Sequence, residues 1–104
     1  MDDKTFNSLV HRRILQIQST LTTKGKEYGQ KDRLHNFKVA ARIDEVEPEV
    51  AAWGMAKKHL VSVMDMIEGR QIPTRSMIDE KVGDMINYLI LIEALLNEKP
   101  LGPE

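Results

Sequence analysis

Four acidic side chains stand at helical spacings in the second half of the chain and could bind a metal ion. Asp65 and Glu68 are three residues apart. Glu80 and Asp84 are four residues apart, so each pair projects from one face of a helix. The short segment 69–74 would make the two helices antiparallel neighbours, with the end of one beside the start of the next. Oxygen ligands alone favour Mg²⁺, with Mn²⁺ as an alternative, over zinc.

The same acids have a purely structural interpretation, which stays open at this point. Carboxylates at these spacings are common on solvated helix faces, and the start of a helix favours a negative charge such as that of Glu80. Glu68 could pair with Arg70 or Lys57 at the surface. The sequence therefore offers a metal site and a set of surface ion pairs as alternatives.

Mg²⁺ engages phosphate oxygens, so the metal hypothesis predicts a nucleotide polyphosphate as substrate. Arg33, Lys57 and Lys58 are candidates for phosphate contacts, because cleavage of a polyphosphate needs positive charge beyond the metal. Lys24 and Lys26 are further candidates, more typical of a solvated helix face. Lys57 interrupts an apolar stripe, so it either extends to solvent or pairs with an acid such as Asp84.

Two histidines and one polar segment complete the candidate site. His59 follows Lys58 on a helix that also carries Ser62 and Asp65, and it could act as a base. The segment from Arg33 to Phe37 could hold a base and a sugar, or could simply close the bundle. The candidate catalytic residues are Glu80, Asp84, Lys57 and His59. The candidate substrate-binding residues are Arg33, His35, Asn36, Phe37, Lys58, Asn87 and Tyr88. The metal set is Asp65, Glu68, Glu80 and Asp84.

The elements that must position these residues are all helices. Apolar side chains recur every three or four residues and predict helices over Thr5 to about Tyr28, Asn36–Ile43, Pro48–Glu68 and Ser76–Leu96. Asp2 or Asp3 is expected to cap the first helix, Asn36 the second and Ser76 the fourth. Pro48 suits a first helical position, and Gly29 and Gly69 suit helix ends.

The predicted fold is an all-α antiparallel bundle of three long helices and one short helix. Its expected inward stripes are Val50, Trp53, Lys57, Leu60, Met64 and Ile67 on one helix, and Ile78, Val82, Met85, Leu89, Ile92 and Leu96 on the next. The last helix is apolar over more of its circumference than a three-helix monomer covers. Self-association into a dimer or tetramer is expected to complete the bundle, with a thick monomeric core as the alternative.

Length and composition restrict the class of protein. The 104 residues predict one domain, residues 1–104, with an irregular tail over residues 98–104 that contains two prolines. A net charge of −1 gives no reason to expect a nucleic-acid partner. The chain has no cysteine, which excludes thiolate zinc sites and thiol nucleophiles. No apolar run approaches the length of a membrane span and no signal-peptide pattern is present, so we expect a cytoplasmic protein without a membrane partner.

Several segments resemble known proteins. "KGKEYG", "DRLHNF", "KKHLVS" and "DEKVGDMINYLILIEALL" together resemble small phage and prophage proteins of unassigned activity, over most of the chain. The helical pair from about Pro48 to Leu96 is similar to the all-α nucleoside triphosphate pyrophosphohydrolases of the MazG type, which carry E-x-x-E followed by E-x-x-D. Asp65 stands at the first of those acids, and Lys81 stands where the third would fall, with Glu80 one place earlier.

The resemblance implies two alternative functions. The first is a Mg²⁺-dependent nucleoside triphosphate pyrophosphohydrolase that releases a monophosphate and pyrophosphate in the cytoplasm of a phage's host cell. Asn87 would support the four metal-binding acids. The second is a non-catalytic, phage-encoded helical protein that binds a nucleotide or a host protein, because Lys81 at a ligand position would repel a metal ion.

Overall fold

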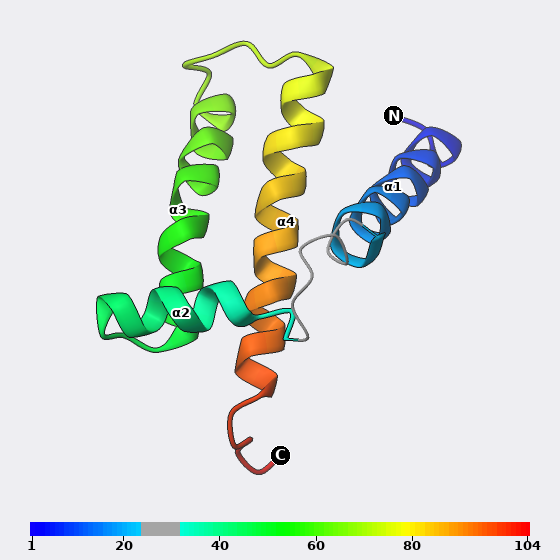
Figure 1. Cartoon of the computed structure of the whole chain (residues 1–104). Helices are drawn as coiled ribbons and strands as arrows, with labels where there is room; N and C mark the ends of the chain where they lie inside the picture. Colours follow the sequence, from blue (N-terminus) through cyan, green and yellow to red (C-terminus); the bar gives the residue numbers. More distant parts are fainter. Residues whose placement is uncertain (24–31) are drawn as a thin grey trace. The chain divides into compact units, whose positions relative to one another are not determined.

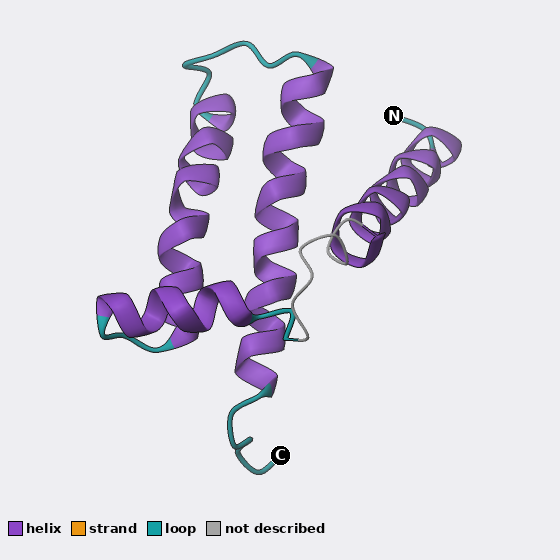
Figure 2. Cartoon of the chain, in the orientation of Figure 1, coloured by secondary structure: helices purple, strands orange, loops and turns teal. Residues whose placement is uncertain are grey.

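The computed structural model of the protein describes residues 1–23 and 32–104, in two compact units, Met1–Lys31 and Asp32–Glu104. Four α-helices are described, and no strand occurs in these ranges (Figures 1 and 2). They are α1 (Asp3–Gln18), α2 (His35–Asp44), α3 (Pro48–Ile67) and α4 (Arg75–Asn97). The all-α prediction is confirmed. No helix within the described residues has the length and apolar character needed to cross a membrane.

The first unit is the amphipathic helix α1, which continues as π-helical turns over Ser19–Thr23. The carboxylate of Asp2 accepts a hydrogen bond from the backbone N–H of Thr5 at 2.8 Å, as a cap of the first turn. This hydrogen bond lowers the pKa of Asp2 below its usual value. The prediction of a cap at Asp2 or Asp3 is confirmed. The expected end near Tyr28 and Gly29, and with it Lys24 and Lys26, lies outside the described residues.

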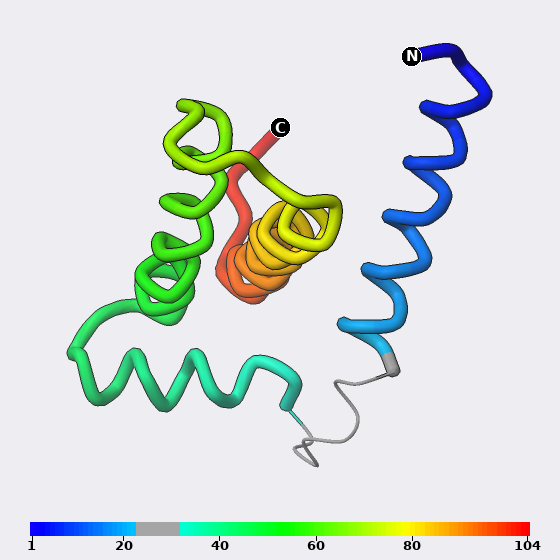
Figure 3. The backbone as a smooth tube through the Cα atoms, turned by 90° about the horizontal axis from the view of Figure 1, so that it is seen from above, coloured from blue at the N-terminus to red at the C-terminus, as the bar shows by residue number. Residues whose placement is uncertain are grey.

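The second unit is built on an antiparallel hairpin of α3 and α4, with α2 packed across one end of α3 (Figures 1 and 3). Its core lies where the three helices meet. Leu34 and Phe37, at the start of α2, pack with Ala52 of α3 and Leu95 of α4. The short helix α2 therefore covers the end of the hairpin away from the α3–α4 turn.

The hairpin packs α3 through its small side chains. Ala51, Ala52 and Ala56 are buried, the last two completely. Small side chains let two helix backbones approach closely. The inward stripe that the sequence predicted for α3 is wrong in this respect, because five of its six members are exposed, Ile67 to 78%, and Leu60 is half-buried. The exposed members of that stripe are Val50, Trp53, Lys57, Met64 and Ile67.

The fourth helix shows the same difference in part. Three members of the predicted inward stripe, Ile78, Leu89 and Leu96, are 42–50% exposed. The side of α4 that packs on the core carries Tyr88, Leu91 and Leu95, together with Ile92 from the predicted stripe. Both helices therefore carry apolar side chains on two sides, and only one side of each helix is buried.

Two helix starts differ from the predicted ones. The cap of α4 is Thr74, whose hydroxyl accepts a hydrogen bond from the N–H of Met77 at 3.2 Å, so Ser76 lies inside the first turn. The helix α2 begins at His35 without a side-chain cap, so the prediction of Asn36 as the cap is wrong. Asp32, which precedes the helix, provides a hydrogen-bond acceptor at this end. Its carboxylate accepts from the backbone N–H of Leu34 at 2.9 Å.

Predicted helix ends at the α2–α3 and α3–α4 connections agree with the structure. Pro48 is the first residue of α3, and α3 ends at Ile67 with Glu68 as its C-cap. Gly69 then has a φ of 75°, a left-handed conformation that glycine adopts without a steric penalty.

Two lysines hold the end of α4 to the starts of the other helices. Lys38 of α2 donates to Asp32 at 2.6 Å and pairs with Glu98 at 2.9 Å. Lys99 pairs with Glu47 at 3.3 Å and with Glu49. These hydrogen bonds lower the pKa of the Asp32 and Glu49 carboxyls and raise the pKa of both lysines. We call these contacts the lysine clamps.

The packing of α3 leads to a first prediction. Replacing the fully buried Ala56 with leucine (Ala56→Leu) should lower the free energy of unfolding by about 1–3 kcal/mol, because the larger side chain forces the two helices apart. Gly54→Ala on the exposed side is the control. No atom lies within 4 Å of the added methyl group, so this change should raise that free energy by roughly 0.5–1 kcal/mol. Urea denaturation followed by circular dichroism measures both, and equal effects would contradict the packing described here.

The lysine clamps predict a pH dependence of stability. The lowered carboxyl pKa values stabilise the fold above the ordinary values of 3.8 and 4.5, and this contribution is lost as the pH falls through the lowered pKa values. The raised lysine pKa values stabilise the fold below 10.5 and lose their effect as the pH rises beyond the raised values. Lys99→Met should therefore shrink the loss of stability on acidification. Arg42→Met, a charge control on the surface of α2, should leave that loss unchanged.

Candidate functional site

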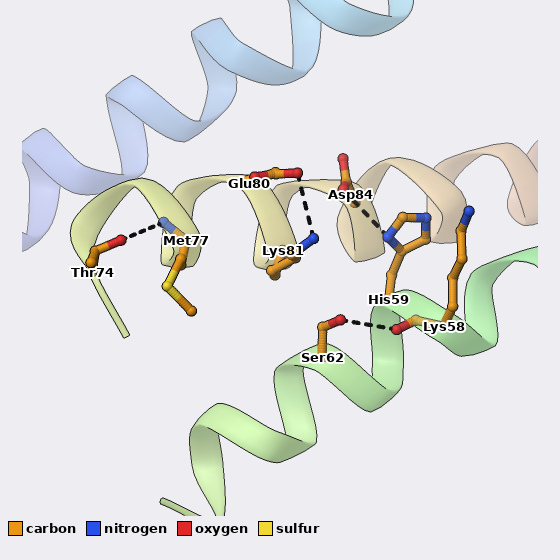
Figure 4. Close-up of polar contacts among 8 residues, drawn as sticks. All are labelled: Lys58, His59, Ser62, Thr74, Met77, Glu80, Lys81 and Asp84. Carbon is orange, nitrogen blue, oxygen red and sulfur yellow. Dashed lines mark hydrogen bonds and ion pairs between the residues drawn. The ribbon is translucent and has the colours of Figure 1, made fainter. Parts of the chain in front are cut away.

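A histidine and an aspartate meet between α3 and α4. The Nδ1 atom of His59 lies 3.3 Å from the Oδ2 atom of Asp84 (Figure 4). The His59 side chain is only 16% exposed, whereas Asp84 keeps more contact with solvent. The separation is slightly longer than an ordinary hydrogen bond, a spacing that is frequent in sites without a bound substrate. A carboxylate in this position favours the tautomer of histidine that carries its proton on Nδ1.

Two aromatic rings support this pair. The ring of Tyr88 is stacked on the His59 imidazole, with 5.1 Å between the ring centres and 29° between the planes. Phe37 contacts Tyr88 edge to face at 6.3 Å and 71°. Since Asp84 and Tyr88 are one helical turn apart, the same side of α4 supplies both partners of His59. Residues of α2, α3 and α4 therefore combine to place one imidazole.

Further polar groups lie on the same two helices. Lys58 precedes His59 on α3, and its side chain is exposed (Figure 4). One turn further along α3, the Ser62 hydroxyl donates to the backbone carbonyl of Lys58 at 3.1 Å. On α4, the Oδ1 atom of Asn87 is buried and has no hydrogen-bond partner within the described part of the chain. A buried amide oxygen without a donor is costly.

The four predicted metal-binding acids do not all meet in the structure. Figure 4 shows Glu80 and Asp84 on one side of α4, as their spacing predicted. Glu80 contacts Lys81 at 3.5 Å, and Glu68 pairs with Arg70 at 3.1 Å, which is the structural alternative for Glu68. Within residues 1–23 and 32–104, no three histidine, aspartate or glutamate side chains are grouped as metal ligands. The four-acid Mg²⁺ site therefore stays a prediction.

The predicted nucleotide-binding segment is divided by the fold. Phe37 is 8% exposed and belongs to the core, so its ring is taken up by packing. Arg33 and Asn36 are exposed and His35 is half-buried. Lys57 lies on the exposed side of α3, with the apolar side chains that do not pack on α4. Among the predicted residues, the hairpin brings His59 of α3 into contact with Asp84 and Tyr88 of α4.

Sequence reasoning missed the contact between His59 and Asp84. It treated both as site residues but assigned the aspartate to a metal and the histidine to a separate role. The available signal was the i, i+4 spacing of Asp84 and Tyr88, which places an acid and a ring on one face of a helix. Which residue of α3 lies opposite that face depends on the register of the hairpin.

Comparisons of the chain with protein-family models, with curated proteins and with solved structures found no match. The residues around His59, with the sequence resemblance described above, are therefore the basis for proposing a function.

Proposed function

We propose that the protein binds a nucleoside triphosphate beside His59 of α3 and Asp84 and Tyr88 of α4, which we call the α3–α4 cluster. We propose that it hydrolyses this nucleotide to a monophosphate and pyrophosphate. The observation that carries this proposal is the half-buried pair of His59 and Asp84. The sequence resemblance supplies the substrate class. Lys58 next to the pair offers the positive charge that polyphosphate binding requires.

The geometry supports a general-base role for His59. With the proton held on Nδ1 by Asp84, the Nε2 atom keeps a lone pair that can accept a proton from water. The water oxygen then bonds to the α-phosphorus, the bond from that phosphorus to the bridging oxygen breaks, and pyrophosphate leaves. Positioned bases of this kind accelerate reactions by about 10²–10⁴-fold.

Mg²⁺ remains part of this proposal because of the substrate. Protein sites commonly hold Mg²⁺ through only one or two carboxylates together with substrate phosphates. Glu80 and Asp84, on one side of α4, would be those carboxylates. Asp65 and Glu68 would then not be ligands, and Glu68 pairs with Arg70. When bound, the ion would neutralise phosphate charge.

Activity assays test the proposal. The protein is incubated with a panel of ribonucleoside and deoxyribonucleoside triphosphates, with and without Mg²⁺, and pyrophosphate release is measured. Asp84→Asn and His59→Gln should each lower turnover by about 10²–10⁴-fold, because each disables the base. Glu93→Gln, on the exposed surface of the same helix, is the control and should keep full turnover. No turnover of any triphosphate by the folded protein would refute the enzymatic function.

A second candidate function is binding without hydrolysis. It is favoured by the pairing of Glu68 with Arg70 and of Glu80 with Lys81, which engages two of the four acids with basic side chains. Such a protein would bind a nucleotide at the same cluster, or a host protein. Calorimetry with Mg²⁺ and with a non-hydrolysable nucleotide distinguishes the two candidates. Nucleotide binding that needs no metal, in a protein without turnover, would support this second function.

We also propose that the protein works as a homo-oligomer. The outer side of α3 exposes Val50, Trp53, Val61, Met64 and Ile67, and α4 exposes Ile78, Leu89 and Leu96. Exposed apolar side chains that recur along one side of a helix are typical of a surface that contacts another chain. A second copy would bury it, as the apolar circumference of α4 led us to expect from the sequence.

Sedimentation velocity tests this association. Met64→Glu should shift the wild-type oligomer to a monomer, because a charge on the outer side of α3 would be buried without a partner in the contact. Arg42→Glu, an exposed position on α2, is the matched control and should sediment as the wild type. A wild-type protein that is monomeric at all accessible concentrations would contradict the proposal.

A further inference from the structure

We infer that Tyr88 is a positioning residue that fixes the tautomer and orientation of His59, with Phe37 holding Tyr88 in place. The stacked contact at 5.1 Å and the edge contact at 6.3 Å form a continuous path of rings from the core to the imidazole. Only its effect on turnover depends on the proposed function. Its effect on the imidazole does not.

The contact with Asp84 alone does not hold the ring. The last side-chain torsion of histidine is broad and roughly two-fold, so a half turn exchanges Nδ1 with a carbon atom at nearly the same place. That half turn would remove the nitrogen from the Asp84 carboxylate, which lies 3.3 Å away in the structure. A second contact is needed to hold the ring in one orientation.

Tyr88 supplies that second contact. Its ring lies nearly parallel to the imidazole, so it covers one face and resists rotation of His59. Because Asp84 and Tyr88 share a side of α4, one helix sets both the polar partner and the wall behind it. The stacked face of Tyr88 is then occupied by His59, which changes the role expected from the sequence, where Tyr88 was a candidate to bind substrate.

Phe37 makes this arrangement depend on α2. It is buried among Leu34, Ala52 and Leu95, and it contacts Tyr88 edge to face. Edge-to-face pairs of aromatic rings contribute beyond simple burial. The position of α2 on the hairpin is thereby transmitted through two rings to the imidazole.

Nitrogen-15 NMR of the histidine side chains tests the inference directly. In alkaline buffer, where imidazoles are neutral, the long-range correlations of each ring show which nitrogen carries the proton. We expect a single tautomer for wild-type His59, protonated on Nδ1. Tyr88→Leu should give a mixture of the two tautomers, whereas Tyr88→Phe, which keeps the ring, should match the wild type. His11 and His35 give reference signals in the same spectra.

Leu95→Ala is the matched control for loss of core packing. Leu95 is 3% exposed and belongs to the same core cluster as Phe37. This variant should unfold at a lower urea concentration than the wild type and still show the wild-type tautomer. In the activity assay, Tyr88→Leu should lower kcat at an unchanged KM, and Tyr88→Phe should restore kcat. If no triphosphate is hydrolysed, the NMR result still decides whether Tyr88 positions His59.

Three results would overturn the inference. The first is a wild-type His59 that is protonated on Nε2 or is a mixture of tautomers. The second is an unchanged tautomer in Tyr88→Leu when circular dichroism shows that this variant is folded. The third applies if Tyr88→Leu does not fold, and it comes from Phe37→Leu. This variant removes the edge contact between Phe37 and Tyr88 and keeps apolar volume. A mixture of tautomers in that variant supports the inference, and the wild-type tautomer overturns it.

Discussion

The close packing of α3 on α4 through small side chains is the constraint on which the rest of the structure depends. Ala52 of α3 packs with Leu95 of α4 in the core, and on the same pair of helices His59 lies within reach of Asp84. A larger side chain at the position of Ala52 or Ala56 would separate the helices and with them the histidine and the carboxylate. Helix packing and the candidate site are therefore one feature of the molecule.

This choice of contact also determines what the surface presents. Because α3 turns its alanines inward, its larger apolar side chains, Trp53 and Met64 among them, lie outside. Small side chains are buried between the helices, and larger apolar side chains of the same helix are exposed to solvent. Self-association is the natural way to remove that surface from water, since burial of apolar area is the main favourable term in protein association. The proposed site and the proposed assembly would therefore both depend on α3.

The short helix α2 and the lysine clamps hold the end of the hairpin that lies away from the α3–α4 turn. Phe37 reaches Tyr88 from the core, while Lys38 and Lys99 connect the end of α4 to the starts of α2 and α3. Apart from Glu49, whose side chain is 16% exposed, the charged groups of these clamps are 36–67% exposed, so salt and pH modulate them more than they modulate the core. The imidazole of His59 is consequently supported from the apolar side by rings, whereas the helix ends are held by charges.

The sequence by itself determined which segments are helical and several of their ends. Periodicity, the Asp2 cap, Pro48 at the first position of α3 and Gly69 in its left-handed conformation are local properties, because each depends on residues a few positions apart. The tertiary structure alone decided which face of each helix is buried. Both α3 and α4 are apolar on two sides, so periodicity could not distinguish an alanine face from a face with Trp53. It also decided that Asp84 meets His59 and that Phe37 belongs to the core, because such contacts depend on the register between helices far apart in sequence.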